Sequence, residues 1–180
     1  MSARDYEQRV METPGLRIEK CQVINMNSGT KFPGDLVTTL VVKTAGGNGV
    51  PNQRCIENIL RYTEKYRLLG TRVSVVLPEY ARISVFADIN AAFGSTNAKS
   101  LIAEAVKGYF ATLRDDFGAR VSYSALYAII DRMDGVLSVN TLTIDASGSD
   151  VTRTREGDLI LAPNVTAILA DTDYIVNTVY

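Results

Sequence analysis

The feature that most constrains the fold is a strict alternation of side chains across residues 81–93. Every second position is aliphatic (Ile83, Val85, Ala87, Ile89), and the positions between them are mostly polar (Ser84, Phe86, Asp88, Asn90). Successive side chains of a β-strand point to opposite faces, so this pattern predicts a strand with one buried and one exposed face. The buried face needs a second layer of structure to cover it.

A helical repeat of apolar residues predicts two long helices, at residues 52–69 and 97–113. The apolar positions of the first are Ile56, Ile59, Leu60, Thr63 and Tyr66, and those of the second are Ala98, Leu101, Ile102, Ala105, Val106, Tyr109 and Leu113. Shorter helices are predicted at residues 2–12, with Ser2 as the N-cap, and at 124–133. Gly70 is expected to cap the helix at 52–69. Further strands are predicted at residues 16–24, 36–43, 71–77, 136–144, 158–161, 165–169 and 174–179. The sequence therefore predicts an α+β fold, with mixed sheets packed with the two long helices.

Two domain organisations are compatible with the sequence. The length of 180 residues favours one domain of about 150 residues, so residues 1–180 form one continuous domain in the first interpretation. In the second, a break near Pro78 separates one α+β lobe at residues 1–77 from another at 78–180. An offset of 120 residues aligns Ser2 with Ser122 and Gly15 with Gly135, which suggests duplication of a helix–strand–strand unit. The alternative is that both segments are examples of the common helix–turn–strand arrangement, without duplication.

Composition excludes several classes of function. The chain has 19 Lys+Arg, 20 Asp+Glu and a net charge of −1, so no basic excess is present to neutralise nucleic-acid phosphates. It has no His, which removes the commonest general base and the commonest transition-metal ligand. The polar N-terminal segment predicts no signal peptide, and no apolar run reaches the roughly 18 residues of a membrane span.

The remaining candidates for chemistry have simpler structural explanations. Cys21 and Cys55 lie among apolar residues, which predicts buried, reduced and inert thiols. Glycine-rich residues 45–49 precede a helix but lack P-loop and dinucleotide-site spacing, so a flexible loop is favoured over a phosphate cradle. The acidic pairs at 115–116 and at 131 with 134 are expected in turns. The scattered acids after residue 144 lack EF-hand spacing. We therefore predict no catalytic residues, no metal site, no cofactor and no enzymatic activity.

Tyrosine is the more informative residue type, with nine Tyr and no Trp. Amphipathic aromatic side chains suit surfaces that become buried in an assembly. The candidate interface residues are Tyr62, Tyr66, Tyr80, Tyr123 and Tyr127. Core packing with the hydroxyl at the rim is an equally good interpretation for most of them. The half-exposed strands also leave sheet edges that a partner subunit can cover.

The order of several segments resembles the C-terminal half of the Baseplate J-like family. The matching segments are residues 2–7 (SARDYE), 13–21 (TPGLRIEKC), 66–73 (YRLLGTRV), 78–80 (PEY), 83–89 (ISVFADI), 118–127 (GARVSYSALY) and 134–136 (DGV). Each motif is loose by itself, and the specificity comes from their order and spacing. The resemblance implies a baseplate wedge subunit of a contractile phage tail, a phage-like bacteriocin or another injection system.

By the same implication, copies of the chain self-associate and contact other wedge and hub proteins. The resemblance carries no catalytic residues. It predicts a structural protein that is assembled in the bacterial cytoplasm and becomes part of the baseplate, with neither nucleic acid nor membrane as partner. The alternative is a small-molecule-binding regulatory α+β module with a cleft lined by Asp88, Asn90 or the loop at 46–49.

Overall fold

A computed structural model describes residues 2–28, 36–46, 48–93, 97–148 and 150–179. The predicted connection at 29–35, part of the glycine-rich loop and residues 94–96 lie outside the described residues. The chain divides into two compact units, Met1–Pro78 and Glu79–Tyr180. Both combine helices with mixed sheets, so the predicted α+β class is confirmed.

The first unit contains α1 (Ala3–Met11), β1 (Ile18–Ser28), β2 (Leu36–Thr44), α2 (Gln53–Thr63) and β3 (Thr71–Val76). The predicted N-cap is present: the Ser2 hydroxyl accepts from the Asp5 amide, and the Asp5 carboxylate accepts from the Ser2 amide. This reciprocal arrangement satisfies two amides that a helix start otherwise leaves unpaired. Strand β2 pairs antiparallel with β1 and parallel with β3, and α2 forms the crossover between the parallel strands.

The core of this unit lies between its sheet and its two helices. Side chains of α1, α2 and the facing sides of β1 and β2 form one buried cluster: Tyr6, Val10, Cys21, Leu40, Val42, Cys55 and Ile59. The burial predicted for both cysteines is confirmed.

The prediction of a five-turn helix at 52–69 was wrong, because α2 ends at Thr63. The Thr63 hydroxyl donates to the carbonyl of Ile59 at 2.9 Å. After Thr63 the backbone changes to tighter i→i−3 bonds, in which the Lys65 amide donates to Tyr62 and the Tyr66 amide donates to Thr63. The chain then turns, and Gly70 adopts a φ of 78°, in the left-handed region that glycine tolerates. Residues 64–70 therefore form a loop before β3, and Gly70 precedes the strand instead of capping the helix.

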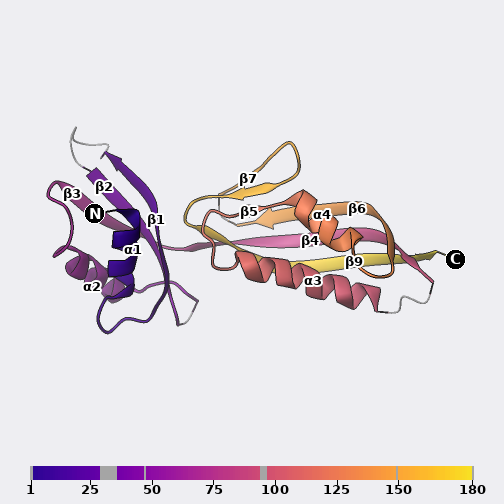
Figure 1. Cartoon of the computed structure of the whole chain (residues 1–180), viewed down its shortest axis with the longest axis horizontal. Helices are drawn as coiled ribbons and strands as arrows, with labels where there is room; N and C mark the ends of the chain where they lie inside the picture. The colour runs from indigo at the N-terminus through magenta and orange to yellow at the C-terminus, as the bar shows by residue number, and fades with distance from the viewer. Residues whose placement is uncertain (1, 29–35, 47, 94–96, 149, 180) are drawn as a thin grey trace. The chain divides into compact units, whose positions relative to one another are not determined.

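The second unit contains β4 (Glu79–Ala92), α3 (Ala98–Leu113), β5 (Arg120–Val121), α4 (Tyr123–Asp131) and β6 (Val136–Ser147). It continues through β7 (Val151–Arg153), β8 (Leu159–Leu161) and β9 (Val165–Val179). Its larger sheet has the order β6-β4-β9, with β4 antiparallel to β6 and parallel to β9. Helices α3 and α4 lie along this sheet (Figure 1). None of the helices in the described residues has both the length and the apolar character needed to span a bilayer.

The alternation that opened the sequence analysis is confirmed in β4. Its odd-numbered side chains from Ala81 to Ala91 are buried, and the even-numbered ones are half-buried or exposed. The buried face packs against α3 and α4 through Ile102, Val106, Phe110, Leu126 and Ile130. In α3 the buried line is Ala98, Ile102, Val106 and Phe110, whereas the predicted member Leu101 is 42% exposed. One face of the sheet thus holds the core, and the other stays open.

The C-terminal segment differs from the prediction of separate strands at 165–169 and 174–179. Both belong to the single strand β9. The pairing with β4 shifts register between the Ile83–Leu169 and Val85–Thr172 pairs, so the intervening Ala170 and Asp171 form a bulge instead of a turn. Sequence analysis also missed the short strands β5 and β7, which pair with β8 in a small sheet.

The internal duplication is not confirmed. Helices α1 and α4 do begin and end at positions 120 residues apart, with Ser2 and Ser122 as N-caps. The strands that follow them are paired differently, however. Strand β1 pairs with the next strand, β2, whereas β6 pairs with the preceding strand β4.

Candidate interaction surfaces

An aromatic pair marks the end of α2 in the first unit. The rings of Tyr62 and Tyr66 lie 5.3 Å apart, and the Arg9 guanidinium of α1 lies 4.7 Å from the centre of the Tyr66 ring. Tyr66 is 39% exposed, and Tyr62 is half-buried. Hydrogen bonding with Tyr66 raises the pKa of the Tyr62 phenol above its ordinary value. Contacts within the first unit therefore fix the pair, and the Tyr66 ring stays partly exposed for contact with another protein.

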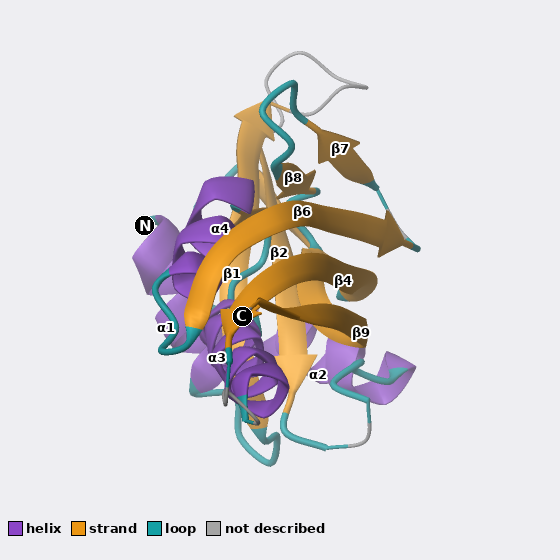
Figure 2. Ribbon diagram, turned by 90° about the vertical axis from the view of Figure 1, so that its right-hand side faces the viewer, coloured by secondary structure: helices purple, strands orange, loops and turns teal. Residues whose placement is uncertain are grey.

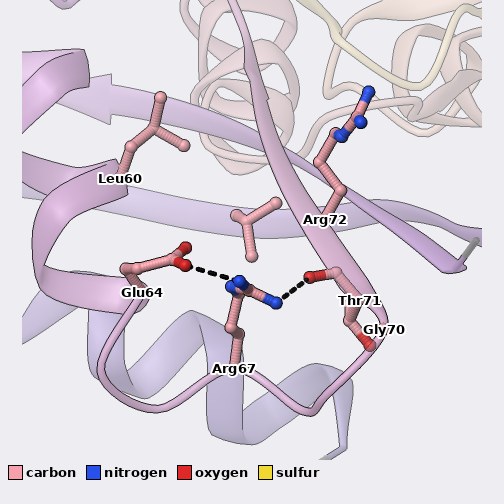
Figure 3. Close-up of a pocket in the computed structure, with 7 residues that line it drawn as sticks. Leu60, Glu64, Arg67, Gly70, Thr71 and Arg72 are labelled. Atoms are coloured by element: carbon pink, nitrogen blue, oxygen red, sulfur yellow. Dashed lines mark hydrogen bonds and ion pairs between the residues drawn. The ribbon is translucent and has the colours of Figure 1, made fainter.

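The loop after this pair is fastened by Arg67. Its guanidinium contacts the Glu64 carboxylate at 2.6 Å and donates to the Thr71 carbonyl at 3.0 Å. These groups line a hollow of about 450 Å³ between the end of α2 and the start of β3, shown in Figure 3. Glu64 and Arg67 neutralise each other, and Arg72 also lines the hollow, so the paired groups act as a loop clamp. Beside the clamp, Leu69 is fully exposed and Leu68 is 48% exposed.

A second aromatic pair lies on α4 in the second unit, where Tyr123 and Tyr127 stack with ring centres 6.5 Å apart. The backbone amide of Tyr123 donates to the Asp158 carboxylate at 2.7 Å. Asp158 is buried and also accepts from Arg120. The Arg120 guanidinium first, and the Tyr123 amide second, hold the pKa of Asp158 below its usual range. This network fixes the start of α4 to the β7–β8 segment, while Tyr127 is 37% exposed.

The five tyrosines do not form one group. Tyr62 and Tyr66 belong to the first unit, Tyr123 and Tyr127 form a separate pair in the second, and Tyr80 is half-buried at the start of β4. Sequence analysis named these five residues without dividing them into pairs.

Sequence analysis missed a third surface, at the outer side of β9. Figure 2 shows β9 at the edge of the β6-β4-β9 sheet. A groove of about 400 Å³ runs between β9 and α3. Its walls are mostly apolar and are formed by Phe110, Ala111 and residues 167–170, with Lys107, Arg114 and Thr172 completing the lining. The available signal was the small residues Ala103 and Ala111, which alternate with the basic residues Lys99 and Lys107 at four-residue spacing.

The open face of the same sheet is polar. Asp88 accepts from Asn177 at 2.6 Å, and the side-chain amides of Asn90 and Asn140 exchange hydrogen bonds at 3.1 Å. Asn90 also donates to Ser138 at 3.0 Å. The residues that a small-molecule cleft was expected to use are thus engaged in a ladder that links the three strands.

Several of the groups considered for chemistry are buried or ion-paired. Burial raises the pKa of the Cys21 thiol to about 12 and also raises that of Cys55. Arg153 pairs with Asp145 at 2.8 Å, and Arg120 pairs with Glu156 at 3.3 Å. In the part of the chain that the structure describes, no group of three or more Cys, Asp or Glu side chains is arranged to hold a metal ion.

These observations define a class: an α+β protein whose sheets are covered on one face by helices, with exposed aromatic pairs and an open edge strand. Among solved structures, this fold is similar to that of a chain of the anti-feeding prophage (AFP) baseplate, determined by cryo-electron microscopy with six-fold symmetry. The match has a TM-score of 0.54 and 14% identity and covers 96% of the present chain. The present chain spans 37% of the length of that baseplate chain.

No family model matches the sequence, and no curated protein matches it. The resemblance to the Baseplate J-like family therefore rests on the ordered motifs alone. At 14% identity, the structural likeness shows a shared fold.

Proposed function

We propose that the chain is a structural wedge subunit in the baseplate of a contractile phage tail or a related injection system. It acts through protein–protein contacts, without a catalytic step, and associates with its own copies and with neighbouring wedge and hub proteins. The observation that carries the proposal is the fold likeness to the AFP baseplate chain over 96% of this chain. The order of the Baseplate J-like motifs supports it independently of that likeness.

The surfaces suit such a role. Tyr66 and Tyr127 present aromatic area that is exposed in the single chain, and aromatic residues are enriched where protein interfaces become buried. The net charge of −1 leaves little long-range repulsion between copies. Each of these properties favours association with proteins.

Sedimentation velocity over a range of concentrations tests the role of the aromatic pair at the end of α2. Wild type is expected to self-associate, and Tyr66→Ala to weaken that association. Within the chain, the substitution removes the ring contacts of Tyr66 with Tyr62 and Arg9, which are worth about 1–2 kcal/mol together. The matched control is Arg61→Ala, at an exposed position on the neighbouring helix α2, which should leave association unchanged.

Comparison with a core variant separates the interface interpretation from the packing interpretation. Ile59 is fully buried on the same helix, and Ile59→Ala is expected to lower the free energy of unfolding by about 2–5 kcal/mol. If Tyr66→Ala destabilises the chain as much as Ile59→Ala and leaves association unchanged, Tyr66 is a packing residue and the proposed interface is wrong.

A further inference from the structure

We propose that the outer edge of β9 from Thr172 to Thr178 pairs antiparallel with the same edge of a second copy of the chain, about a two-fold axis at Ile175. The two β6-β4-β9 sheets then join into one. The inference rests on the proposed function in one respect, that copies of the chain associate, and it names the surface and the register of that association.

The backbone edge of this segment is unpaired in the part of the chain that the structure describes. β9 is the edge strand of its sheet and pairs only with β4. Beyond the bulge at Ala170 and Asp171, its pairing with β4 is regular from Thr172 to Val179. A regular edge of this length presents amide and carbonyl groups that can bind another strand.

Helix α3 leaves the centre of the segment clear. At the end of α3, the Leu113 carbonyl accepts from the Thr166 hydroxyl at 3.4 Å, and near its start Lys99 lies 3.9 Å from Asp173. The helix therefore follows β9 from Thr166 to about Asp173, and β9 continues past it toward the C-terminus (Figure 1). In the proposed register, Asp173 lies opposite Asn177 of the second copy. The two copies of α3 are thus on opposite sides of the two-fold axis and do not overlap.

The side chains on the open face of the segment complement themselves in this register. Asp173, Ile175 and Asn177 lie on that face, because their partners on β4 are even-numbered residues. Antiparallel pairing about Ile175 places Ile175 opposite Ile175 and Asp173 opposite Asn177 of the second copy. Ile175 is 47% exposed in the single chain, so pairing shields it from water. Asn177 donates one N–H to Asp88 at 2.6 Å, and its second N–H can donate to the Asp173 carboxylate.

The side chains on the helix side of the segment are complementary as well. Thr172 lies opposite Thr178 of the second copy, and Tyr174 lies opposite Val176. Tyr174 is buried and Val176 is half-buried, so this second pair continues the apolar core across the junction of the two sheets. Thr–Thr pairs and pairs of an aromatic with a β-branched residue are both favourable across antiparallel strands.

The neighbouring registers lack this match. A pair centred on Asp173 opposes two carboxylates, and a pair centred on Tyr174 places Asp173 opposite Ile175. A pair centred on Val176 places Ile175 opposite Asn177. A two-fold interface uses the same patch on both copies and must be self-complementary. Among these registers, residues 172–178 (TDYIVNT) meet that condition about Ile175.

The contact between Lys99 and Asp173 is weak enough to rearrange when the edges meet. The two side chains are 63% and 70% exposed, and their charged groups lie 3.9 Å apart. Exposed ion pairs of this kind contribute little to stability. Lys99 therefore moves aside at little cost when Asp173 accepts from Asn177 of the second copy.

Disulfide cross-linking of the full chain tests the register directly. Ile175→Cys places two thiols opposite each other, with Cβ atoms about 5 Å apart, which a disulfide can bridge after a small adjustment. We expect a covalent dimer under mild oxidation. The matched control is Ile168→Cys, which is 42% exposed on the same face of β9 but lies before the bulge and should not cross-link. The native Cys21 and Cys55 are buried and should not react.

A mixture of two variants tests the symmetry of the pair. Chains with Asp173→Cys mixed with chains with Asn177→Cys should form a disulfide-linked dimer that contains one of each. Neither variant alone should cross-link, because the register places residue 173 opposite residue 177 and not opposite itself.

Hydrogen exchange measures the pairing without a cross-link. Amides within residues 172–178 should exchange more slowly as the concentration of the chain rises. Ile175→Lys places two ammonium groups opposite each other in place of two isoleucines, so it should raise the dissociation constant of the pair about tenfold and remove this protection. Ile168→Lys is the matched control and should behave like wild type. Circular dichroism checks that every variant is folded.

Four results would overturn the inference: no dimer from Ile175→Cys, equal cross-linking of Ile168→Cys, cross-linking of the 173 or 177 variant alone as efficiently as the mixture, or exchange in 172–178 that does not depend on concentration. The proposed function is tested separately, by co-purification with tail proteins. If tail proteins co-purify and the cross-link fails, the baseplate role stands without this pairing. If the cross-link forms and no tail protein co-purifies, the pairing stands and the baseplate role is wrong.

Discussion

The hydroxyl of Tyr6 provides a quantitative test of the structure. Tyr6 is fully buried in the core of the first unit, and its hydroxyl has no hydrogen-bond partner among the described residues. Leaving a buried polar group unpaired costs about 1–3 kcal/mol. Tyr6→Phe removes the hydroxyl and keeps the ring that packs against Val10 and Ile59. We therefore expect the free energy of unfolding to rise by about 1 kcal/mol, at the lower end of that range.

Urea unfolding followed by circular dichroism measures this change. With a slope of about 2 kcal/mol per molar urea, the midpoint should rise by about 0.5 M. Hydrogen exchange of amides in α1 and β2 assigns the change to the first unit. The matched control is Tyr109→Phe, because the Tyr109 hydroxyl accepts from the Ser122 amide at 2.9 Å. That variant should lose about 1 kcal/mol.

The two substitutions are expected to change the free energy of unfolding in opposite directions, and this difference is the test. If Tyr6→Phe lowers stability as much as Tyr109→Phe does, the Tyr6 hydroxyl has a partner and the assigned core environment is incorrect.

Three further predictions follow from local geometry. Because burial raises the pKa of Cys21 to about 12, its thiol should resist alkylation at pH 8 until urea unfolds the chain; rapid modification of the folded chain would contradict this. Gly118 has a φ of 68°, and a Cβ added there would lie 3.2 Å from the backbone of Pro163. Gly118→Ala should therefore lower the free energy of unfolding by about 1–2 kcal/mol, measured by thermal unfolding. Gly108 lies on α3 with open space around it, so Gly108→Ala should raise the free energy of unfolding by up to about 1 kcal/mol. Arg120 holds the pKa of Asp158 low. This carboxylate therefore stabilises the chain above its unfolded pKa of about 3.9, and the stabilisation is lost as the pH falls through the lower folded pKa. Asp158→Asn should be less stable than wild type at pH 7 and equally stable in acid, and a stability difference that is constant with pH would refute the assignment.

Local periodicity explains why much of the fold could be predicted. The alternation in β4 and the N-cap at Ser2 are determined by neighbouring residues, and both are confirmed. The end of α2 could not be predicted, because apolar spacing continues to Tyr66 while the backbone changes to i→i−3 turns after Thr63 and Arg67 fastens the following loop. β9 appeared to be separate strands because a bulge and a turn use similar residues, and pairing with β4 decides between them.

The candidate surfaces were predictable to different extents. Sequence analysis selected the tyrosines as candidates but did not pair them, and the structure brings Tyr62 beside Tyr66 and Tyr123 beside Tyr127. The edge of β9 depends on strand order, which no local pattern contains. The groove beside it exists only because α3 and β9 are neighbours in space. The Thr166 hydroxyl of β9 donates to the carbonyl of Leu113 at the end of α3, although 53 residues separate the two in the sequence.

The most direct test of the proposed role is purification of the tagged chain after co-expression with the genes that surround its own. The account predicts that sheath, tube and spike proteins co-purify with it, identified by mass spectrometry, in particles with a baseplate visible by electron microscopy. A chain that remains at the mass of a single copy, with none of these proteins bound and no tail genes beside its own, would contradict the account.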